Sequence, residues 1–461
     1  MTATVTGATL RRRVEPDTAA RMARSVRAAT GVGPRTEEVA DWLAGHAAGN
    51  RFRVERIPFA GLDGRSFAAD TGNLVHRSGR FFSIEGIHVT HPQGPFPEWQ
   101  QPIIDQPEVG ILGILVKEFD GIPHFLLQAK MEPGNPNLLQ LLPTVQATRS
   151  NYSKVHRGAD VKYLEYFLNP GTGSVLADVL QSEHGSWFLR KVNRNMLVEV
   201  QGDVPVAENF CWLTLGQIGE LLRRDNVVNM DARTVLSCVP AGHDEDHALH
   251  PDGELRSWIT GERCRHDVRV RRLPLAEVAD WKRGEWSVDH VPERYFRVMA
   301  VSVEAGSREV GSWTQPLIEP LGTGVTSFVT RRFDGVPHVL AHARVEGGFA
   351  DTVELAPTVQ HTPGNYQHLA DRPPFLDYVL GADPGRIRYE AVHSEEGGRF
   401  YHAQSRYLIV EADEAGAPAQ PPPGYCWVTP GQLSSLVRHS RYVNVQARSL
   451  LACLNTASVT L

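Results

Sequence analysis

Glu132 is the first candidate for acid–base chemistry in this sequence. It lies in the segment KMEPGN, beside a Pro-Gly turn that follows an apolar run, and a second copy of this segment keeps it as Glu346. A carboxyl group placed in this way can take up or release a proton, and Tyr152 and His76 carry further groups suited to proton transfer. Each also has a structural interpretation: a turn-stabilising carboxylate, a half-buried tyrosine, and a histidine at the start of a strand.

The elements that would position these groups are duplicated. Six segments recur in the same order, the first three at a constant separation of 214 positions and the others with small insertions or deletions. The pairs are 99–105 with 313–319, 119–134 with 333–348, 141–152 with 355–366, 182–188 with 394–400, 210–217 with 425–432, and 227–238 with 442–453. A period of this length predicts two globular repeats with their own cores instead of a solenoid.

The local patterns predict an α+β fold with mixed or antiparallel sheets in both repeats. Asp120-Gly121 lies between two apolar runs and indicates a β-hairpin, as does Asp334-Gly335. Residues 138–148 are a further strand candidate, and Thr214 can cap a helix that follows it. We predict an N-terminal helical lead-in (1–69), a first repeat (70–239), a linker (240–286) and a second repeat (287–461).

The composition argues against several classes of function. The 461 residues are 41% hydrophobic and 22% charged, and the formal net charge of −6 indicates no basic surface for nucleic acid. Five cysteines without a CxxC pair indicate neither a disulfide framework nor a thiolate zinc site. The apolar runs are too short to span a membrane, and the first residues do not resemble a signal peptide. We therefore expect a soluble cytoplasmic protein without nucleic-acid or membrane partners.

Motifs for common cofactors are missing from the sequence. There is no GxGxxG after a strand, no GxxxxGK[ST], no HExxH and no GxSxG. The segment HDEDHALH at 243–250 has metal-like spacings, but a solvated linker is the favoured interpretation because metal sites need rigid support. We expect neither a metal nor a cofactor.

The segments QPII at 101–104, FDGIPHFLLQAKMEPGN at 119–135 and LLPTVQATRSNY at 141–152 resemble the conserved blocks of the NDP-hexose 2,3-dehydratase family. The resemblance covers nearly the whole chain, because both repeats match. It implies tandem Nudix-like domains, a homodimer, and a lyase that acts on dTDP-4-keto-6-deoxyglucose. It also implies a place in deoxysugar biosynthesis for natural products such as antibiotics, coupled to a 3-ketoreductase.

Two other functions stay open. A Nudix-type sugar-nucleotide hydrolase would need a helix with an Arg-Glu-x-x-Glu-Glu carboxylate cluster for magnesium, and the corresponding segment offers Asp160 and Glu165 without such a cluster. A non-catalytic sugar-nucleotide-binding protein is the second alternative. We favour the lyase over both.

The implied reaction is a base-catalysed elimination. The ketone at carbon 4 acidifies the proton on carbon 3, and the resulting enolate expels the carbon 2 hydroxyl. The predicted catalytic residues are Glu132, Tyr152, Lys130 and His76. The predicted substrate-binding residues are Trp99, Asn135, Gln146, Arg149, Ser150, Asn151 and Arg194. Arginines suit the diphosphate and a tryptophan suits the base, although surface ion pairs and a core aromatic are the plainer alternatives.

A second pocket is expected from the equivalent residues Trp313, Arg344, Glu346, Gln360, Asn365, Tyr366 and Arg406. The repeats differ where polar residues cluster. In the second repeat Lys130, Asn135, Arg149, His156 and His184 are replaced by Arg344, Phe349, Pro363, Ala370 and Glu396. We therefore expect the first repeat to be catalytic.

Overall fold

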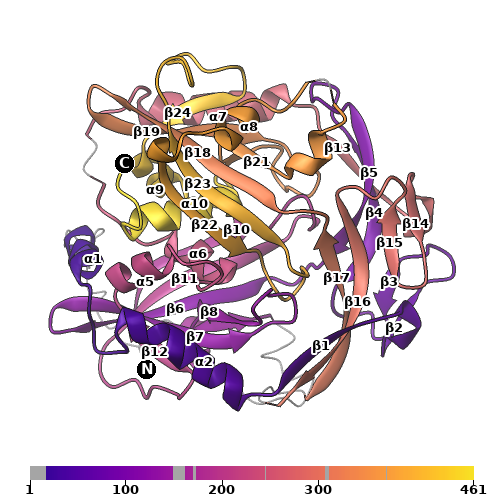
Figure 1. Ribbon diagram of the computed structural model, residues 1–461, viewed down its shortest axis with the longest axis horizontal. Coiled ribbons are helices and arrows are strands. Elements are labelled where there is room, and N and C mark those ends of the chain that lie inside the picture. The colour runs from indigo at the N-terminus through magenta and orange to yellow at the C-terminus, as the bar shows by residue number, and fades with distance from the viewer. Residues whose placement is uncertain (1–16, 149–160, 170–172, 244–245, 307–310, 370) are drawn as a thin grey trace, which may run out of the picture.

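The computed structural model describes residues 17–148, 161–169, 173–243, 246–306, 311–369 and 371–461. In this part of the chain, four β-sheets and a set of short helices form one molecule (Figure 1). We call the part up to residue 239 the first half and the part from residue 246 the second half. The structure contains both helices and sheets, which confirms the predicted mixed α and β composition.

Each half contains a mixed seven-stranded sheet. In the first half its strands are β6 (Gly110–Phe119), β7 (Ile122–Met131), β8 (Leu139–Pro143), β9 (Val145–Ala147), β10 (Gly173–Ser182), β11 (Val192–Val200) and β12 (Phe210–Leu213). In the second half they are β18 (Gly324–Phe333), β19 (Val336–Arg344), β20 (Glu354–Ala356), β21 (Val359–His361), β22 (Ile387–Ser394), β23 (Gln404–Glu411) and β24 (Tyr425–Val428). The pairs β6–β11 and β18–β23 are parallel, and the other pairs in these sheets are antiparallel.

The predicted hairpins are confirmed in both sheets. Phe119 pairs with Ile122, which leaves Asp120 and Gly121 as a two-residue turn with φ of 48° and 78°. Asp334 and Gly335 form the equivalent turn, with φ of 50° and 83°. Two successive positive φ angles are the geometry that an Asp-Gly pair favours between antiparallel strands.

Two five-stranded antiparallel sheets lie beside the large ones, and each takes one strand from the opposite half. Their strands are β1 (Phe52–Ile57), β2 (Arg65–Phe67), β3 (Leu74–His76), β4 (Ser83–Thr90), β5 (Glu98–Asp105), β13 (Arg269–Leu273), β14 (Trp281–Arg283), β15 (Ser287–His290), β16 (Phe296–Ala305) and β17 (Ser312–Pro320). β1 pairs with β16, whereas β13 pairs with β4. The halves have therefore exchanged their first strands, and Figure 1 shows β1 running across the molecule to its partner.

The segments predicted as lead-in and linker both contain strands as well as helices. The lead-in contains β1 and β2 as well as α1 (Thr18–Arg27), η1 (Thr36–Glu38), α2 (Val39–Gly49) and η2 (Phe59–Gly61). The predicted linker, 240–286, contains α7 (Asp252–Arg265), β13, η4 (Leu275–Glu277) and β14. Apolar and charged residues alternate at the start of FRVERI and of RVRRL, a strand pattern, and the partner of each strand lies in the other half. The division of the chain into two domains stays a prediction.

The remaining helices lie mainly between and around the large sheets. They are α4 (Glu165–Leu168), α5 (Leu215–Leu221), α6 (Met230–Leu236), α8 (Leu376–Leu380), α9 (Pro430–Leu436) and α10 (Val445–Asn455), with 3₁₀ turns η5 (Pro363–Tyr366) and η6 (Pro384–Arg386). Helices α6 and α10 pack on each other in a core shared by both halves. Thr214 caps α5 as predicted, because its side chain accepts a hydrogen bond from the Gln217 amide. In the described part of the chain, no helix has the length and apolar character to cross a membrane.

Candidate active site

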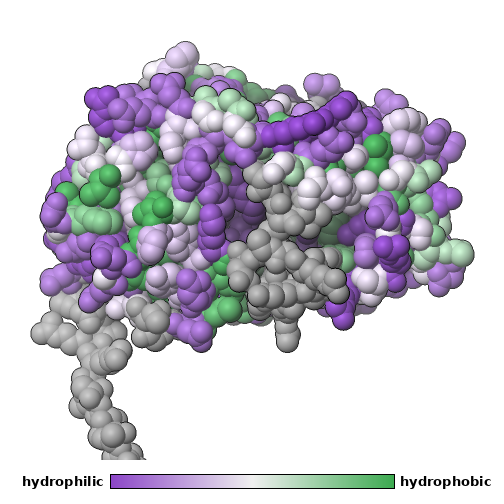
Figure 2. All heavy atoms as spheres, turned by 90° about the horizontal axis from the view of Figure 1, so that it is seen from below, coloured by the Kyte–Doolittle hydropathy of each residue, from purple (hydrophilic) through white to green (hydrophobic). Residues whose placement is uncertain are grey.

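A cavity of about 220 Å³ lies where the large sheet of the first half meets elements of the second half. Its polar lining from the first half comes from β7, β9, β11, α6 and the residues that directly follow β5, β7 and β10. The second half contributes β17 and the segment after β22. The polar and charged lining residues used below are Gln106, Lys130, Glu132, Gln146, Glu183, Lys191, Asn193, Asp231, Gln315, Glu396 and Arg399. Figure 2 shows the molecule from below, with hydrophilic side chains over most of the face and a hollow near its middle.

Glu132, Gln146 and Lys130 form one hydrogen-bonded group in the wall of this cavity. Gln146 Nε2 lies 2.9 Å from Glu132 Oε1, and its carbonyl oxygen accepts a hydrogen bond from the Lys130 ammonium. Asn229 Nδ2 lies 3.4 Å from Glu132 Oε2. Because both oxygens of the buried Glu132 carboxyl face donors, this side chain is held in one place.

Asp231 joins the same group from helix α6. Gln146 Nε2 lies 2.6 Å from Asp231 Oδ2, and the Asp231 amide donates to Asn229, the residue that caps the helix. Burial raises the pKa of the Asp231 carboxyl well above its usual range. The negative charges of Glu396, Glu183 and Glu132 add to this rise. Asp231 therefore keeps its proton to a higher pH than an ordinary aspartic acid, which suits a general acid.

Glu396 and Arg399 enter the cavity from the second half. Desolvation in the cavity wall raises the pKa of Glu396 to about 7; the charge of Arg399 opposes this rise, and Glu132 adds to it. Arg399 Nε donates to Gln106 Oε1 at 3.1 Å. A carboxyl with a pKa near 7 can exchange protons in either direction at neutral pH.

Glu183 and Lys191 complete the charged lining on the first half. Asn193 Nδ2 donates to Glu183 Oε1 at 2.7 Å, and the Lys191 ammonium donates to the backbone oxygen of Glu108. Burial lowers the pKa of Lys191 to about 8. The cavity therefore carries both anionic and cationic groups at close quarters. Among the described residues, no cluster of three or more His, Cys, Asp or Glu side chains is arranged as a metal site.

Comparison with known proteins identifies the family of this chain. A model of the NDP-hexose 2,3-dehydratases matches residues 36–239 and again residues 252–454. This chain belongs to the NDP-hexose 2,3-dehydratase family. The two matched segments also start near α2 and α7, earlier than the repeats predicted from the sequence.

Three relatives support the same assignment over almost the full length. Each is named dTDP-4-dehydro-6-deoxy-α-D-glucopyranose 2,3-dehydratase. The protein from Amycolatopsis orientalis is 60% identical, covering 97% of this chain and 96% of the relative. Those from Saccharopolyspora spinosa and Streptomyces violaceoruber are 52% and 49% identical, covering 91% and 90% of this chain and 91% and 96% of the relatives. The family predicted from the sequence is confirmed, and the chain is a dehydratase.

Of the residues predicted for the dehydratase's first site, Lys130, Glu132 and Gln146 lie together in the cavity wall. Arg149, Ser150, Asn151 and Tyr152 lie outside the described residues. Asn135 is buried behind the wall, where its side chain donates to the Leu138 backbone oxygen at 3.2 Å.

Three predicted residues lie elsewhere. His76 is on β3 in a small sheet, 2.7 Å from the Ser78 hydroxyl. Arg194 forms an ion pair with Asp178 on the neighbouring strand, at 2.5 Å. Trp99 lies beside Gly347 in the second half, and its equivalent Trp313 lines the cavity instead. Trp313, predicted for the second pocket, thus lies at the first cavity, because β17 reaches the large sheet of the first half.

The second half of the dehydratase repeats the network in altered form. Arg344 Nε lies 2.7 Å from Glu346 Oε1, and Gln360 Nε2 donates to the same oxygen at 3.0 Å. The other predicted residues contact neighbours in the same half: Tyr366 OH lies 2.9 Å from His361 Nδ1, the Asn365 side chain accepts from the Tyr295 amide, and Arg406 pairs with Glu390.

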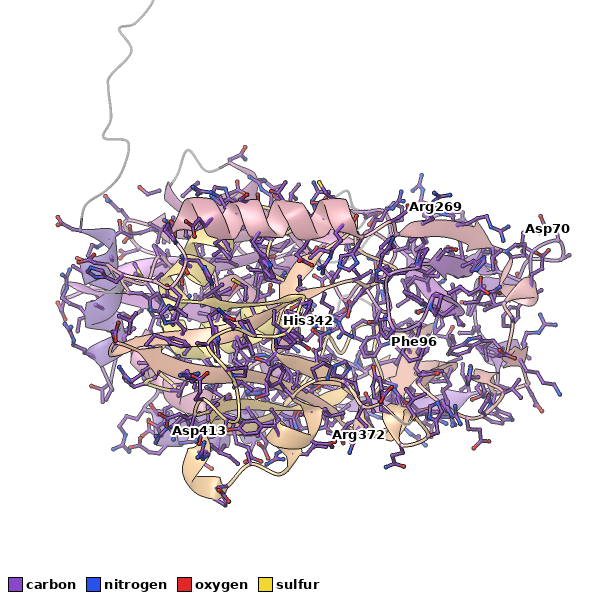
Figure 3. The ribbon with its side chains drawn as sticks, turned by 90° about the horizontal axis from the view of Figure 1, so that it is seen from above. Asp70, Phe96, Arg269, His342, Arg372 and Asp413 are labelled. Carbon is purple, nitrogen blue, oxygen red and sulfur yellow. The ribbon has the colours of Figure 1, made fainter. Side chains whose placement is uncertain are left out.

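Aromatic side chains fill the space around this second network. His342 lies near the middle of the molecule in Figure 3, and its ring stacks on Tyr425 with centroids 4.4 Å apart. Phe349, the replacement for Asn135, lies against Gly185 of the first half. A ring in place of an amide leaves this part of the second half more apolar than the first cavity.

Sequence reasoning missed Glu183, Lys191, Asp231, Glu396 and Arg399. The alignment of the repeats contained a signal for most of them, since Asp231 aligns with Gln446, Lys191 with Ala403 and Arg399 with Trp187. His184 was expected to enrich the first site, but it lies 2.9 Å from Glu395 and stacks on Trp187. Its counterpart Glu396 is the residue that reaches the cavity, because this segment crosses between the halves.

Proposed function

We propose that this dehydratase acts on dTDP-4-dehydro-6-deoxy-α-D-glucopyranose and eliminates the carbon 2 hydroxyl together with the carbon 3 proton. The product is a 3,4-diketo-2,6-dideoxy sugar nucleotide. The names of the three relatives support the substrate. The observation that carries the chemistry is the pair of carboxyls with raised pKa, Asp231 and Glu396, which line one cavity from two halves of the chain.

The two carboxyls divide the proton transfers. Glu396, with a pKa of about 7, is available as the base that removes the proton from carbon 3. Asp231, whose carboxyl pKa burial raises well above its usual range, is the acid that protonates the departing hydroxyl. We infer that the first half carries the catalytic pocket and that the second half supplies its base.

The elimination then balances in three steps. The carbon 3–hydrogen bond breaks, its proton passes to Glu396, and its electron pair forms the enolate with the carbon 4 oxygen. The enolate collapses, and the carbon 2–oxygen bond breaks as Asp231 delivers its proton, which releases water. The resulting enol tautomerises to the 3,4-diketone, and proton transfer from Glu396, directly or through water, restores Asp231.

Other lining residues suit the remaining tasks. Lys130 provides a positive charge for the enolate oxygen. Its ammonium is held by Gln146, which also contacts Glu132. Lys191 and Arg399 provide cations for the diphosphate, and Trp313 provides a flat surface for the base. Glu132 orients Gln146, the amide that contacts both Lys130 and Asp231. Tyr152, Arg149, Ser150 and Asn151 stay candidate contacts to the substrate.

The finer context belongs to the same proposal. We infer that each large sheet with its helices is a Nudix-like unit, that two chains form a homodimer, and that the enzyme works in the cytoplasm. The labile diketone would be consumed by a 3-ketoreductase in deoxysugar biosynthesis for antibiotics and related natural products.

The test is turnover of the named substrate by the purified protein without added metal or nicotinamide. The product carries a ketone β to its anomeric diphosphate, so enzyme-dependent release of intact dTDP, unchanged by EDTA, is expected on ion-exchange chromatography. Addition of a 3-ketoreductase and NADPH should divert this flux into a stable 2,6-dideoxy sugar nucleotide. Magnesium-dependent formation of dTMP would contradict the proposal in favour of hydrolysis, and binding without turnover would favour a non-catalytic role.

A further inference from the structure

Arg233 is a fully buried cation on α6, two residues after Asp231, and its guanidinium connects the two halves. One terminal nitrogen donates to the Val228 backbone oxygen at 2.6 Å, within the first half. The other donates at 2.8 Å to the backbone oxygen of Ser394, at the end of β22 in the second half. Nε donates to the Ser449 hydroxyl at 3.2 Å. All three nitrogens are therefore bonded, and the side chain has a single geometry.

The Ser394 carbonyl lies two residues before Glu396, the base proposed above. The same strand end is held a second time, because the Gln140 side chain donates to the Ser394 hydroxyl at 2.8 Å. Beyond Glu396, the Gly397 carbonyl accepts a hydrogen bond from the Gly134 amide at 2.8 Å. The segment that carries Glu396 is thus fixed by contacts from the first half on both sides of the residue.

Arg448 on α10 makes the equivalent contacts in the opposite direction. It donates to the backbone oxygens of Val443 at 2.6 Å and Ser182 at 2.5 Å, and its Nε donates to the Thr234 hydroxyl. Ser182 precedes Glu183 in the first half. Arg448 is therefore a matched buried arginine that does not contact the segment carrying Glu396.

We propose that Arg233 is a positioning residue for the elimination: it sets the place of Glu396 relative to Asp231 by bonding the Ser394 carbonyl from the helix that carries Asp231. This inference rests on the proposed function. Among the contacts that hold this segment, the guanidinium is the one that ties it to the helix carrying the acid, so that acid and base from different halves keep their distance. Misplacement of a reacting group by about 1 Å can cost about 100-fold in rate, so a single hydrogen bond at this point matters.

A double-mutant cycle tests the proposal. Arg233→Lys keeps the charge but cannot reach three acceptors at once, and we expect kcat to fall by about 10- to 100-fold with little change in KM. In a Glu396→Gln background, Arg233→Lys should lower kcat by less than about twofold, because a residue that acts through Glu396 has nothing left to position. Arg448→Lys, the matched control, should lower kcat by the same factor in the wild-type and in the Glu396→Gln enzyme.

The outcomes separate clearly. An equal loss for Arg233→Lys with and without Glu396 would overturn the positioning role and leave a structural one. Ser449→Ala removes one acceptor of Arg233 with a small change in volume and is the alternative variant if Arg233→Lys does not fold. It should give a smaller loss of kcat with the same dependence on Glu396. If the wild-type enzyme does not turn over the sugar nucleotide, the proposed function itself fails, whereas turnover with an additive cycle overturns only this inference.

Discussion

Charged side chains of both signs crowd around the cavity at the scale of single residues. The carboxyls are Glu132, Glu183, Asp231 and Glu396, and the cations are Lys130, Lys191 and Arg399. Burial raises the pKa of Asp231 and that of Glu396, and the negative charges of neighbouring carboxylates raise both further. The proposed elimination needs one protonated and one ionised carboxyl, and raised pKa values favour the protonated form of the first.

Substitution of the paired glutamates distinguishes the two halves. Glu132→Gln should lower kcat by at least about 10-fold, because it removes a negative charge and replaces one of the two acceptor oxygens, which face Gln146 and Asn229, with an amide donor. Glu346→Gln changes the equivalent group, bonded to Arg344 and Gln360, and should leave kcat within about twofold. Steady-state kinetics of both purified variants checks this, and equal losses would contradict a catalytic first half.

Asp231→Asn separates catalysis from stability. The variant cannot donate the carboxyl proton, and we expect a loss of about 100-fold or more in kcat. Folding stability should stay equal or rise, because a buried carboxyl is replaced by the neutral amide type found at Gln446 in the second half. Rates and thermal melting measured on the same preparation test both parts. A variant that is fully active, or inactive only because it is unfolded, would contradict the role of Asp231.

Part of this site could be predicted from the sequence. Glu132, Lys130 and Gln146 lie next to a hairpin and a recognisable turn, so local pattern was enough to find them. Asp231 sits 85 positions beyond Gln146, and Glu396 comes from the other repeat. Their closeness depends on packing between the halves, which no local pattern encodes. Raised pKa values likewise arise from burial and from neighbouring charges that only the fold brings together.

Elements of the two halves make corresponding contacts with different chemistry. In the first half Gln140 on β8 bonds the hydroxyl of Ser394, whereas in the second half Glu354 on β20 bonds the hydroxyl of Ser182. Burial raises the pKa of Glu354 from 4.5 to about 7. A raised pKa in the folded state means that its contribution to stability is complete below pH 4.5 and is lost as pH rises through 7.

Glu354→Gln gives the second half a glutamine, the residue that the first half has at the equivalent position, Gln140. We expect the variant to be more stable than wild type at pH 8 by up to about 3 kcal/mol, the equivalent of the shift in pKa. The difference should shrink toward pH 4.5. Urea unfolding at several pH values measures it, with Glu390→Gln on the exposed side of β22 as the control. A pH-independent difference would contradict the explanation.

The regular elements were predictable because their causes are local. The Asp-Gly pairs determine the hairpins, and Thr214 caps its helix through a bond three residues away. The exchange of β1 and β13 was not predictable in the same way. Both segments have the alternation of a strand, but nothing within them distinguishes a partner in their own half from β16 or β4 in the other.

At the scale of the whole molecule, the two halves are interlocked. Exchanged strands, the packing of α6 on α10 and the shared core join them over long interfaces. The cavity itself needs residues from both, so neither half can form it alone. On the proposed mechanism the two repeats form a single catalytic unit, and we expect the chain between the halves to be needed only as a tether.

A cut in this connection tests that expectation. Asp246 and His247 are exposed residues between α6 and α7, and a specific protease site inserted between them should be cleavable in the folded protein. We expect the cleaved protein to elute as one species in gel filtration and to keep more than about half of its activity. Separation of the fragments, or loss of activity while they stay together, would contradict the interlocked arrangement.

The central claim is that Glu396, a carboxyl from the second half, acts as the base in the first half's cavity. The most direct test is the pH dependence of kcat/KM for dTDP-4-dehydro-6-deoxy-α-D-glucopyranose. Since the base must be ionised, the rate should rise with pH through an apparent pKa of about 7. In Glu396→Gln this limb should vanish, with the remaining rate lower by about 100-fold or more. The same limb at the same pH in the variant would show that another group is the base.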